Sequence, residues 1–488
     1  MSYLGIDLGT SGLRALLLSE GGKVIGAAER SYTSQHPQSG WSEQDPAKWT
    51  EALDAAVHEL RERFPAFADL KGIGVAGHMH GATLLDETGA VIRPCILWND
   101  TRSHAEARQL DEMRDVRSLS GNIVFPGFTA PKLLWVKRHE PENFARIAKV
   151  LLPAAYLNFY LTGDMIADRS DSAGTSWLDV AARDWSKSLL DAGEMRLDQM
   201  PRLVDGSEAA GTLSPALARS WGVSADVTVA GGAGDNAAAA CGIGALNDGD
   251  AFLSLGTSGV LLAARTTCRP DPDSALHTFC HAVPDRWYQM GVMLSATDSL
   301  NWLASITGST APVLTAALGD DLRPPGNTLF LPYLSGERTP HNDADIRGSF
   351  LGLGVGTGVT DLTQAVLEGV AFGLRDSLEA FEANGTSLSR LLAIGGGAQS
   401  TYWLKLIATA LNVTLERPQD GEFGAAMGAA RLAVMAHTGA VSEDVLTKPE
   451  IAETIQPVSE LKDQHDAAYE TFKAAYPMVK AAQRSNKN

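Results

Sequence analysis

A five-residue segment, LGTSG, occurs twice in this chain, at residues 8–12 and 255–259. Each copy stands between two apolar runs of strand length, which is the pattern of a β-hairpin. A chain of 488 residues is too long for one hydrophobic core. Two copies in two domain-sized halves therefore predict two domains that share this hairpin. We place the division between residues 242 and 250, giving domains 1–245 and 246–488; one copy alone would fit an ordinary turn equally well.

The turn of each hairpin has the composition of a phosphate-binding loop. Gly, Thr and Ser present backbone N–H groups and hydroxyls with no bulky side chain above them, so an anion can approach closely. Two such turns facing each other would bind a polyphosphate from both sides. Asp7 precedes the first turn, where a carboxylate suits Mg²⁺ bound to phosphates; the alternative is an Asp that caps the turn. Ser254 and Leu255 precede the second turn, without an acid.

A second carboxylate lies in the Gly- and Ala-rich segment 230–241 (AGGAGDNAAAAC). The pattern predicts a strand, a tight turn and a helix that begins near Asp235. A carboxylate held at a helix start in a cleft between two domains suits a general base for phosphoryl transfer to a hydroxyl. The alternative for Asp235 alone is a helix N-cap. We favour the base because the two phosphate-binding hairpins accompany it.

Three further segments have the composition of ligand-binding loops. Residues 77–81 (GHMHG) follow a buried strand. Their two His residues point to opposite faces of an extended chain, so they form a poor metal pair and better suit hydrogen bonds to a polyol. Residues 97–100 (LWND) add an aromatic ring and polar groups, and residues 395–398 (GGGA) allow a phosphate or flat ligand to approach. Structural histidines and ordinary loops are the alternatives.

The charge of the chain excludes some partners. With 58 acidic and 40 basic residues the formal net charge is −18, so we expect neither nucleic acid nor anionic lipid as a partner. The four cysteines have no zinc or disulfide spacing and are expected to be reduced. There is no signal peptide pattern and no apolar run of the roughly 20 residues that a membrane helix needs. These features predict a cytoplasmic protein that contacts no membrane.

Together these segments resemble the FGGY carbohydrate kinases, which share a structural superfamily with actin and hexokinase. The resemblance covers essentially the whole chain. Two long signatures make it specific, at residues 127–139 (GFTAPKLLWVKRH), with Lys132 and Trp135 at fixed places, and at 348–368 (GSFLGLGVGTGVTDLTQAVLE). It implies an α/β fold of two actin-like (ribonuclease H-like) domains with an interdomain catalytic cleft. It also implies transfer of the γ-phosphoryl group of ATP, with Mg²⁺, to a sugar hydroxyl.

Within the family, the chain is most similar to the kinases that act on xylulose, which implies phosphorylation of D-xylulose to D-xylulose 5-phosphate. Glycerol kinases carry an Arg-Glu pair where this chain has Met79-His80, which argues against glycerol. Thr401 stands where some relatives place an Asn, so the adenine contact at that position stays open. The similar segments are residues 5–11, 41–46, 79–81, 98–100, 234–236 and 330–340.

The resemblance also implies roles for individual residues. Asp235 corresponds to the catalytic base and Asp7 to the acid that binds near Mg²⁺. The residues expected to contact the sugar are Met79, His80, Asp235 and Asn236. The residues expected to surround ATP are Thr10, Ser11, Arg14, Gly256, Thr257, Asn301, Gly396, Gly397 and Ala398.

Other functions are open from the sequence. A kinase for another ketose, a polyol or gluconate would use the same site. A non-catalytic sugar or nucleotide sensor would keep the cleft, but the presence of both Asp7 and Asp235 argues against it. An actin-like polymer subunit would share the hairpins without needing a sugar pocket. The expected partners are a small sugar and ATP, with a homodimer as one candidate assembly.

Overall fold

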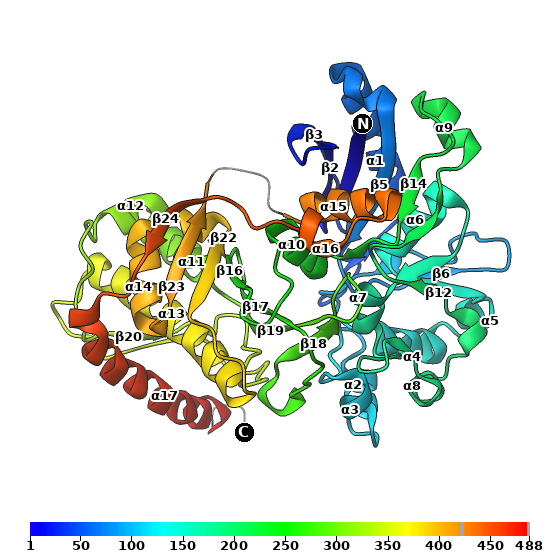
Figure 1. The fold of residues 1–488 in the computed structure, drawn as a ribbon. Coiled ribbons are helices and arrows are strands. Elements are labelled where there is room, and N and C mark those ends of the chain that lie inside the picture. Colours follow the sequence, from blue (N-terminus) through cyan, green and yellow to red (C-terminus); the bar gives the residue numbers. More distant parts are fainter. Residues whose placement is uncertain (420–423, 486–488) are drawn as a thin grey trace.

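The computed structural model describes residues 1–419 and 424–485 and contains two seven-stranded sheets (Figure 1). In the first sheet, β1 is antiparallel to β2 and parallel to β5, so the sheet is mixed. Its strands, in spatial order, are β13 (Ala209–Thr212), β14 (Thr228–Ala230), β5 (Leu70–Gly77), β1 (Ser2–Leu8), β2 (Gly12–Ser19) and β3 (Val24–Ser31), with β15 (Ala233–Gly234) paired to the end of β5.

The second sheet repeats the central arrangement of the first. β16 is antiparallel to β17 and parallel to β22, as β1 is to β2 and β5. The two LGTSG segments connect β1 to β2 and β16 to β17, and the α/β fold class predicted from the sequence is confirmed. Its strands, in spatial order, are β18 (His277–Cys280), β19 (Trp287–Met293), β17 (Gly259–Arg265), β16 (Ala251–Leu255), β22 (Arg390–Ile394), β23 (Thr414–Pro418) and β24 (Ile451–Ile455).

Helices cover both faces of the first sheet. Leu4 and Ile6 of β1 pack in one core with α1 and α6, whereas Tyr3 packs with α15 on the other face. This division follows from the alternation of side chains along a strand. The apolar stripe of α1, with Trp49 and Leu53, is buried as its helical period predicts. These helices are α1 (Ala47–Arg63), α6 (Pro153–Thr162), α10 (Asp235–Ile243) and α15 (Ala425–Thr438).

Further helices pack in the core of the second sheet, and shorter ones lie outside the two large sheets. The second core contains α11 (Thr297–Thr307), α12 (Ala311–Ala316), α13 (Val359–Ala383), α14 (Thr401–Leu411) and α17 (Lys462–Ser485). The remaining α-helices are α2 (His104–Asp111), α3 (Val116–Ser120), α4 (Thr129–His139), α5 (Pro141–Ala145), α7 (Arg169–Ser172), α8 (Lys187–Ala192), α9 (Pro215–Trp221) and α16 (Ser442–Val445).

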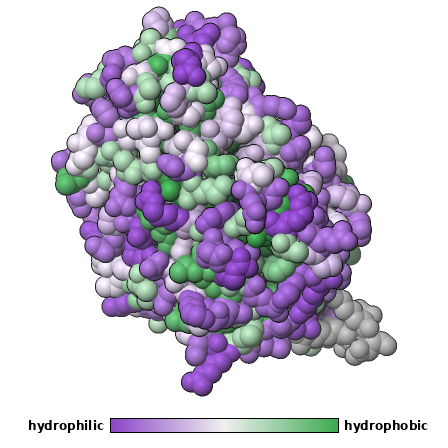
Figure 2. Space-filling view, turned by 90° about the vertical axis from the view of Figure 1, so that its right-hand side faces the viewer, coloured by the Kyte–Doolittle hydropathy of each residue, from purple (hydrophilic) through white to green (hydrophobic). Residues whose placement is uncertain are grey.

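The residues that the structure describes also form five two-stranded sheets: β4 (Glu43–Gln44) with β7 (Cys95–Ile96), β6 (Thr83–Leu85) with β8 (Lys149–Leu151), β9 (Ile166–Asp168) with β12 (Arg202–Val204), β10 (Leu178–Asp179) with β11 (Asp184–Trp185), and β20 (Leu329–Leu331) with β21 (Ser349–Leu351). Figure 2 shows one face of the surface, where hydrophilic side chains predominate between smaller apolar patches. None of the described helices combines the length and the apolar character that crossing a membrane requires.

Helix α15 comes from the last part of the chain but lies on the first sheet, beside α10 (Figure 1). The approach is close because glycines line it. A Cβ atom at Gly5 would lie 1.9 Å from the Ala426 carbonyl oxygen, and one at Gly74 would lie 2.0 Å from that of Ala429. The division predicted at residues 242–250 separates the two large sheets, but α15 crosses back, so one cut in the sequence does not separate the packed units.

We expect Gly428→Ala to destabilise the protein. A Cβ atom there would lie 1.8 Å from the Ala238 carbonyl oxygen, so α10 and α15 would have to move apart. Overpacking costs about 1–3 kcal/mol, and a clash with backbone should reach about 3 kcal/mol in the free energy of unfolding, measured by urea denaturation. The control Gly21→Ala meets no atom within 4 Å and should change it by less than about 0.5 kcal/mol. Equal stability of the two variants would contradict the close contact.

Candidate active site

The ends of neighbouring strands bring the two predicted acids together. Asp7 lies near the end of β1, opposite Ala76 of β5. β15 pairs with the end of β5 through Gly234 and Gly77, and Asp235 follows as the first residue of α10. Both carboxylates therefore lie at the same edge of the first sheet, close enough for the charge of Asp235 to raise the pKa of Asp7.

Burial makes both carboxylates weaker acids, and repulsion adds to this effect at Asp7. Burial, followed by the charge of Asp235, raises the pKa of Asp7 to about 7, while Arg14, opposite it in β2, acts in the other direction. Burial also raises the pKa of Asp235 to about 6, against hydrogen bonds from Asn236. The backbone N–H and the side-chain amide of Asn236 donate to Oδ1 of Asp235 at 2.7 and 2.8 Å. These bonds leave Oδ2 for a ligand hydroxyl.

The two acids suit a divalent cation that also binds phosphate groups. A divalent cation beside them would offset the repulsion that raises the pKa of Asp7. In residues 1–419 and 424–485, no group of three or more His, Cys, Asp or Glu side chains is arranged to hold a metal ion. Mg²⁺ commonly binds one or two carboxylates together with phosphates and water. The site therefore fits a magnesium ion that binds together with a nucleotide.

The turns of the two LGTSG hairpins leave hydroxyl groups accessible. The Gly9 N–H donates to the Gly12 carbonyl at 2.9 Å, and the Gly256 N–H donates to the Ser258 carbonyl at 3.1 Å, so each turn is closed by its own backbone. Small residues around open N–H groups allow phosphate oxygens to approach. The other turn residues are Thr10, which is half-buried, and Ser11, Thr257 and Ser258, which are exposed.

The ring of His80 has a fixed orientation and a defined protonation state. Its φ of +70° is left-handed, and its ring stacks on Phe128 with centroids 4.3 Å apart. Nδ1 lies 2.7 Å from the Gly174 carbonyl. Because a carbonyl only accepts, Nδ1 carries the proton and Nε2 is an acceptor. Burial lowers the pKa of His80 to about 3, so the ring is neutral at pH 7 and can accept from a sugar hydroxyl.

Two side chains of α4 hold His80 in this conformation. Lys132 Nζ and Thr129 Oγ1 donate to the His80 carbonyl at 2.8 and 3.1 Å. Burial lowers the pKa of Lys132 to about 7, which reduces the charge that must be buried there. The sequence identified Lys132 only as a signature residue, since its contact with His80 depends on how α4 packs against the loop.

Met79 and His78 lie beside His80 but in different surroundings. Met79 is buried against the strand that precedes Asp235: a Cβ atom at Gly234 would lie 2.9 Å from its Cγ. His78 packs edge-on against Trp49, with ring centroids 5.6 Å apart, and burial lowers its pKa to about 3. His78 thus belongs to the core of the first sheet, whereas Met79 and His80 lie toward Asp235.

The segment at residues 97–100 is divided between two environments. The indole N–H of Trp98 donates to Thr10 Oγ1 at 3.0 Å, which connects this loop to the first hairpin. Asp100 is buried and pairs with Arg102 at 2.7 Å. Its side chain stabilises the loop from within. At this residue, the polarity seen in the sequence is therefore structural.

A cavity of about 610 Å³ adjoins the second hairpin. Thr297 lines it and donates through its N–H and Oγ1 to the Gly256 carbonyl, at 3.0 and 2.7 Å. A cavity of this volume suits a small organic ligand such as a nucleoside. Among the residues expected near ATP, Asn301, Gly396 and Gly397 line it, as does Thr401, whereas Ala398 is buried.

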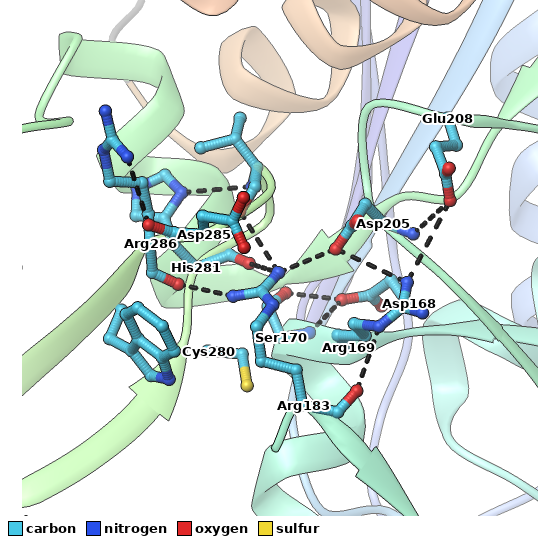
Figure 3. A network of polar contacts seen from close by, with 12 residues as sticks. Asp168, Arg169, Ser170, Arg183, Asp205, Glu208, Cys280, His281, Asp285 and Arg286 are labelled. Atoms are coloured by element: carbon cyan, nitrogen blue, oxygen red, sulfur yellow. Dashed lines mark hydrogen bonds and ion pairs between the residues drawn. The ribbon is translucent and has the colours of Figure 1, made fainter. Parts of the chain in front are cut away.

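A network around Arg183 connects the turn between β18 and β19 to the first part of the chain (Figure 3). Arg183 donates to Asp205 at 2.7 Å and to the carbonyls of Val283 and Arg286 at 3.2 and 2.6 Å. Arg169 donates to the Arg183 carbonyl at 3.0 Å. The network fixes this end of the second sheet on the first part of the chain.

Residues of α7 hold the strand that precedes Asp235. Asp168 accepts from the Ser170 and Asp171 N–H groups at 2.8 and 2.9 Å and so caps this short helix. The Ser170 hydroxyl donates to Asp168 and accepts from the Gly234 N–H at 3.2 Å. This support could not be predicted from the sequence, because the partners are 64 positions apart and no motif marks them.

Known proteins match this chain over both parts of the site. The N-terminal domain model of the FGGY family of carbohydrate kinases matches residues 2–242, and the C-terminal domain model matches residues 251–437. A xylulose kinase of Escherichia coli (strain K12) is 46% identical, covering 98% of this chain and 99% of its own length. One from Bacillus subtilis (strain 168) is 37% identical, covering 89% of this chain and 88% of its own.

Solved structures share the fold. A "xyloylose kinase" from Brucella ovis has a TM-score of 0.97 at 55% identity, covering 99% of this chain and 100% of its own. A xylulose kinase from Rhodospirillum rubrum has a TM-score of 0.91 at 28% identity with the same coverage. The expected family and its fold are confirmed, and the chain, a sugar kinase, belongs to the FGGY family of carbohydrate kinases.

Proposed function

We propose that this enzyme phosphorylates D-xylulose at the 5-hydroxyl, with ATP as donor, and releases D-xylulose 5-phosphate. The position of Asp235, near Asp7 and directly after Gly234, on which Met79 packs, carries the proposal. It places a base between an acceptor pocket and a phosphate-binding edge. Relatives named xylulose kinases, similar over nearly the full length, support the choice of sugar.

Asp235 is the proposed general base. Its Oδ1 is held by Asn236, so Oδ2 takes the proton of the sugar hydroxyl as that oxygen bonds to the γ-phosphorus and the bond to the leaving ADP oxygen breaks. A pKa of about 6 leaves this carboxylate ionised at pH 7 while making it a stronger base than an ordinary Asp. Neutral His80 orients the sugar by accepting a hydroxyl hydrogen bond.

The remaining site residues bind the nucleotide in this proposal. The cavity beside Thr297 takes the adenosine, and the two hairpin turns take the phosphates from both sides. Bound Mg²⁺ neutralises charge on the transferred group, and Asp7 would hold it. The residues proposed to bind the nucleotide are Thr10, Ser11, Arg14, Gly256, Thr257, Asn301, Gly396, Gly397 and Ala398.

Because ATP is the donor, we place the enzyme in the cytoplasm. The homodimer stays a prediction.

Asp235→Asn should lower kcat by about 10²–10⁴-fold, because the amide cannot take the hydroxyl proton. Affinities for D-xylulose and ATP, measured by calorimetry, should stay within about twofold, since the substitution keeps the shape of the side chain. ADP release in a coupled assay gives kcat. The exposed Asp226→Asn is the control and should match the unchanged enzyme. A variant that keeps more than about a tenth of the activity would exclude Asp235 as the base.

Asp7→Ala should raise the Mg²⁺ concentration needed for half-maximal rate by roughly tenfold, because one carboxylate ligand is lost. Initial rates over a Mg²⁺ titration at fixed ATP and saturating D-xylulose measure this. kcat should fall more than the affinity for the sugar, which Asp7 does not contact in this account. An unchanged Mg²⁺ titration would refute the metal role.

A further inference from the structure

The loop between β20 and β21 holds Arg338 in a fixed position. The buried carboxylate of Glu337 accepts from the N–H groups of Leu294 and Arg338 at 3.1 and 2.7 Å. The Thr339 hydroxyl accepts from the Val292 N–H at 3.0 Å and donates to a carbonyl at 2.9 Å. The loop is therefore anchored on both sides of Arg338, through Thr339 to β19 and through Glu337 to Leu294, the residue that follows β19.

The guanidinium of Arg338 lies against Phe125, in the first part of the chain. It sits 4.4 Å from the centre of the Phe125 ring, and its Nη1 is 3.5 Å from Nε2 of His277. Within residues 1–419 and 424–485, no carboxylate lies within ion-pair distance of it, although the charge of the adjacent Glu337 favours its ionised form. Burial lowers the pKa of Arg338 to about 10, so it is charged at pH 7. A buried cation without a direct ion pair is costly unless a ligand supplies acceptors.

The hydrogen bonds of His277 define how it faces Arg338. Asn122 Oδ1 accepts from the Thr278 N–H at 3.0 Å, so it is an acceptor toward His277 Nδ1 as well, at 3.2 Å. Nδ1 of His277 therefore carries the proton, and Nε2 is the acceptor that faces Arg338. Burial keeps the pKa of His277 well below its usual range. A neutral ring thus orients the guanidinium without neutralising its charge.

A series of contacts leads from the strand before Asp235 through His80 and Phe128 to Arg338. Met79 packs next to the strand before Asp235, and His80 follows it and stacks on Phe128. The Phe128 ring is 6.0 Å from that of His277, which contacts Arg338. The charge of Arg338 also contributes to the low pKa of His80, but not to that of Asp235.

We propose that Arg338 binds the acceptor sugar, donating hydrogen bonds to the carbonyl and hydroxyl oxygens at the end opposite the phosphorylated hydroxyl. This inference rests on the proposed function and adds a contact from the second part of the chain to a pocket otherwise built from the first. The planar fork of a guanidinium matches two neighbouring oxygens, such as those of a ketone and its adjacent hydroxyl, better than a lysine ammonium does.

The test compares Arg338→Met with Arg338→Lys and with the control Arg347→Met. Arg347 is an exposed arginine of the same loop, and its guanidinium donates to the carbonyls of Ala344 and Ile346. Calorimetry with D-xylulose and no nucleotide should show affinity lowered roughly 10- to 100-fold for Arg338→Met, the loss of hydrogen bonds to a charged donor. The KM for D-xylulose should rise to match, while the KM for ATP stays within about twofold. Arg338→Lys, which keeps the charge, should lie between.

Xylitol, an acceptor without a carbonyl group, distinguishes sugar binding by Arg338 from a purely structural role. Arg338→Met should weaken xylitol binding less than D-xylulose binding, whereas a distorted pocket would weaken both alike. D-xylulose affinity within twofold of the unchanged enzyme in Arg338→Met, or equal losses for the two ligands, would overturn the inference alone. If the unchanged enzyme neither binds nor phosphorylates D-xylulose, the proposed function fails, and this role with it. Should Arg338→Met not fold, Arg338→Lys decides by the same criteria.

Discussion

The close contact of α10 and α15 fixes where the two acids proposed for catalysis lie. At Gly428 the two helix backbones approach so closely that no side chain fits, and at Gly5 and Gly74 α15 lies directly on the first sheet. Since β1 carries Asp7 and α10 begins with Asp235, the spacing of the two acids follows from backbone packing. Close-packed elements hold such spacing better than loops do.

Charge removed from water is the second constraint on the site. Burial raises the pKa of both Asp7 and Asp235, and it lowers those of Lys132 and Arg338. The charged form of each of these side chains is less stable in the ligand-free protein than it would be in water. Mg²⁺, phosphates and a polyol offer the missing charges and hydrogen bonds, so the groups that burden the fold are those that ligands would stabilise.

Features that depend on neighbouring residues could be predicted from the sequence, and those that depend on distant ones could not. The LGTSG turns, the helix start at Asp235 and the stripe of α1 each arise within about 20 residues of local pattern. The return of α15 to the first sheet and the support of Gly234 by Ser170 join segments with no shared pattern. Arg338 belonged to a recognised segment, but its place near His80 needed the fold.

The central claim is that Asp235 acts as a base whose strength is set by burial, and the pH dependence of kcat/KM for D-xylulose tests it most directly. The carboxylate accepts a proton only when ionised, and burial puts its pKa at about 6. With saturating MgATP, kcat/KM should be constant above about pH 7 and fall roughly tenfold per unit below about pH 6. The residual activity of an Asp235→Asn enzyme should lack this limb. A flat profile down to pH 5, or the same limb in both enzymes, would contradict the account.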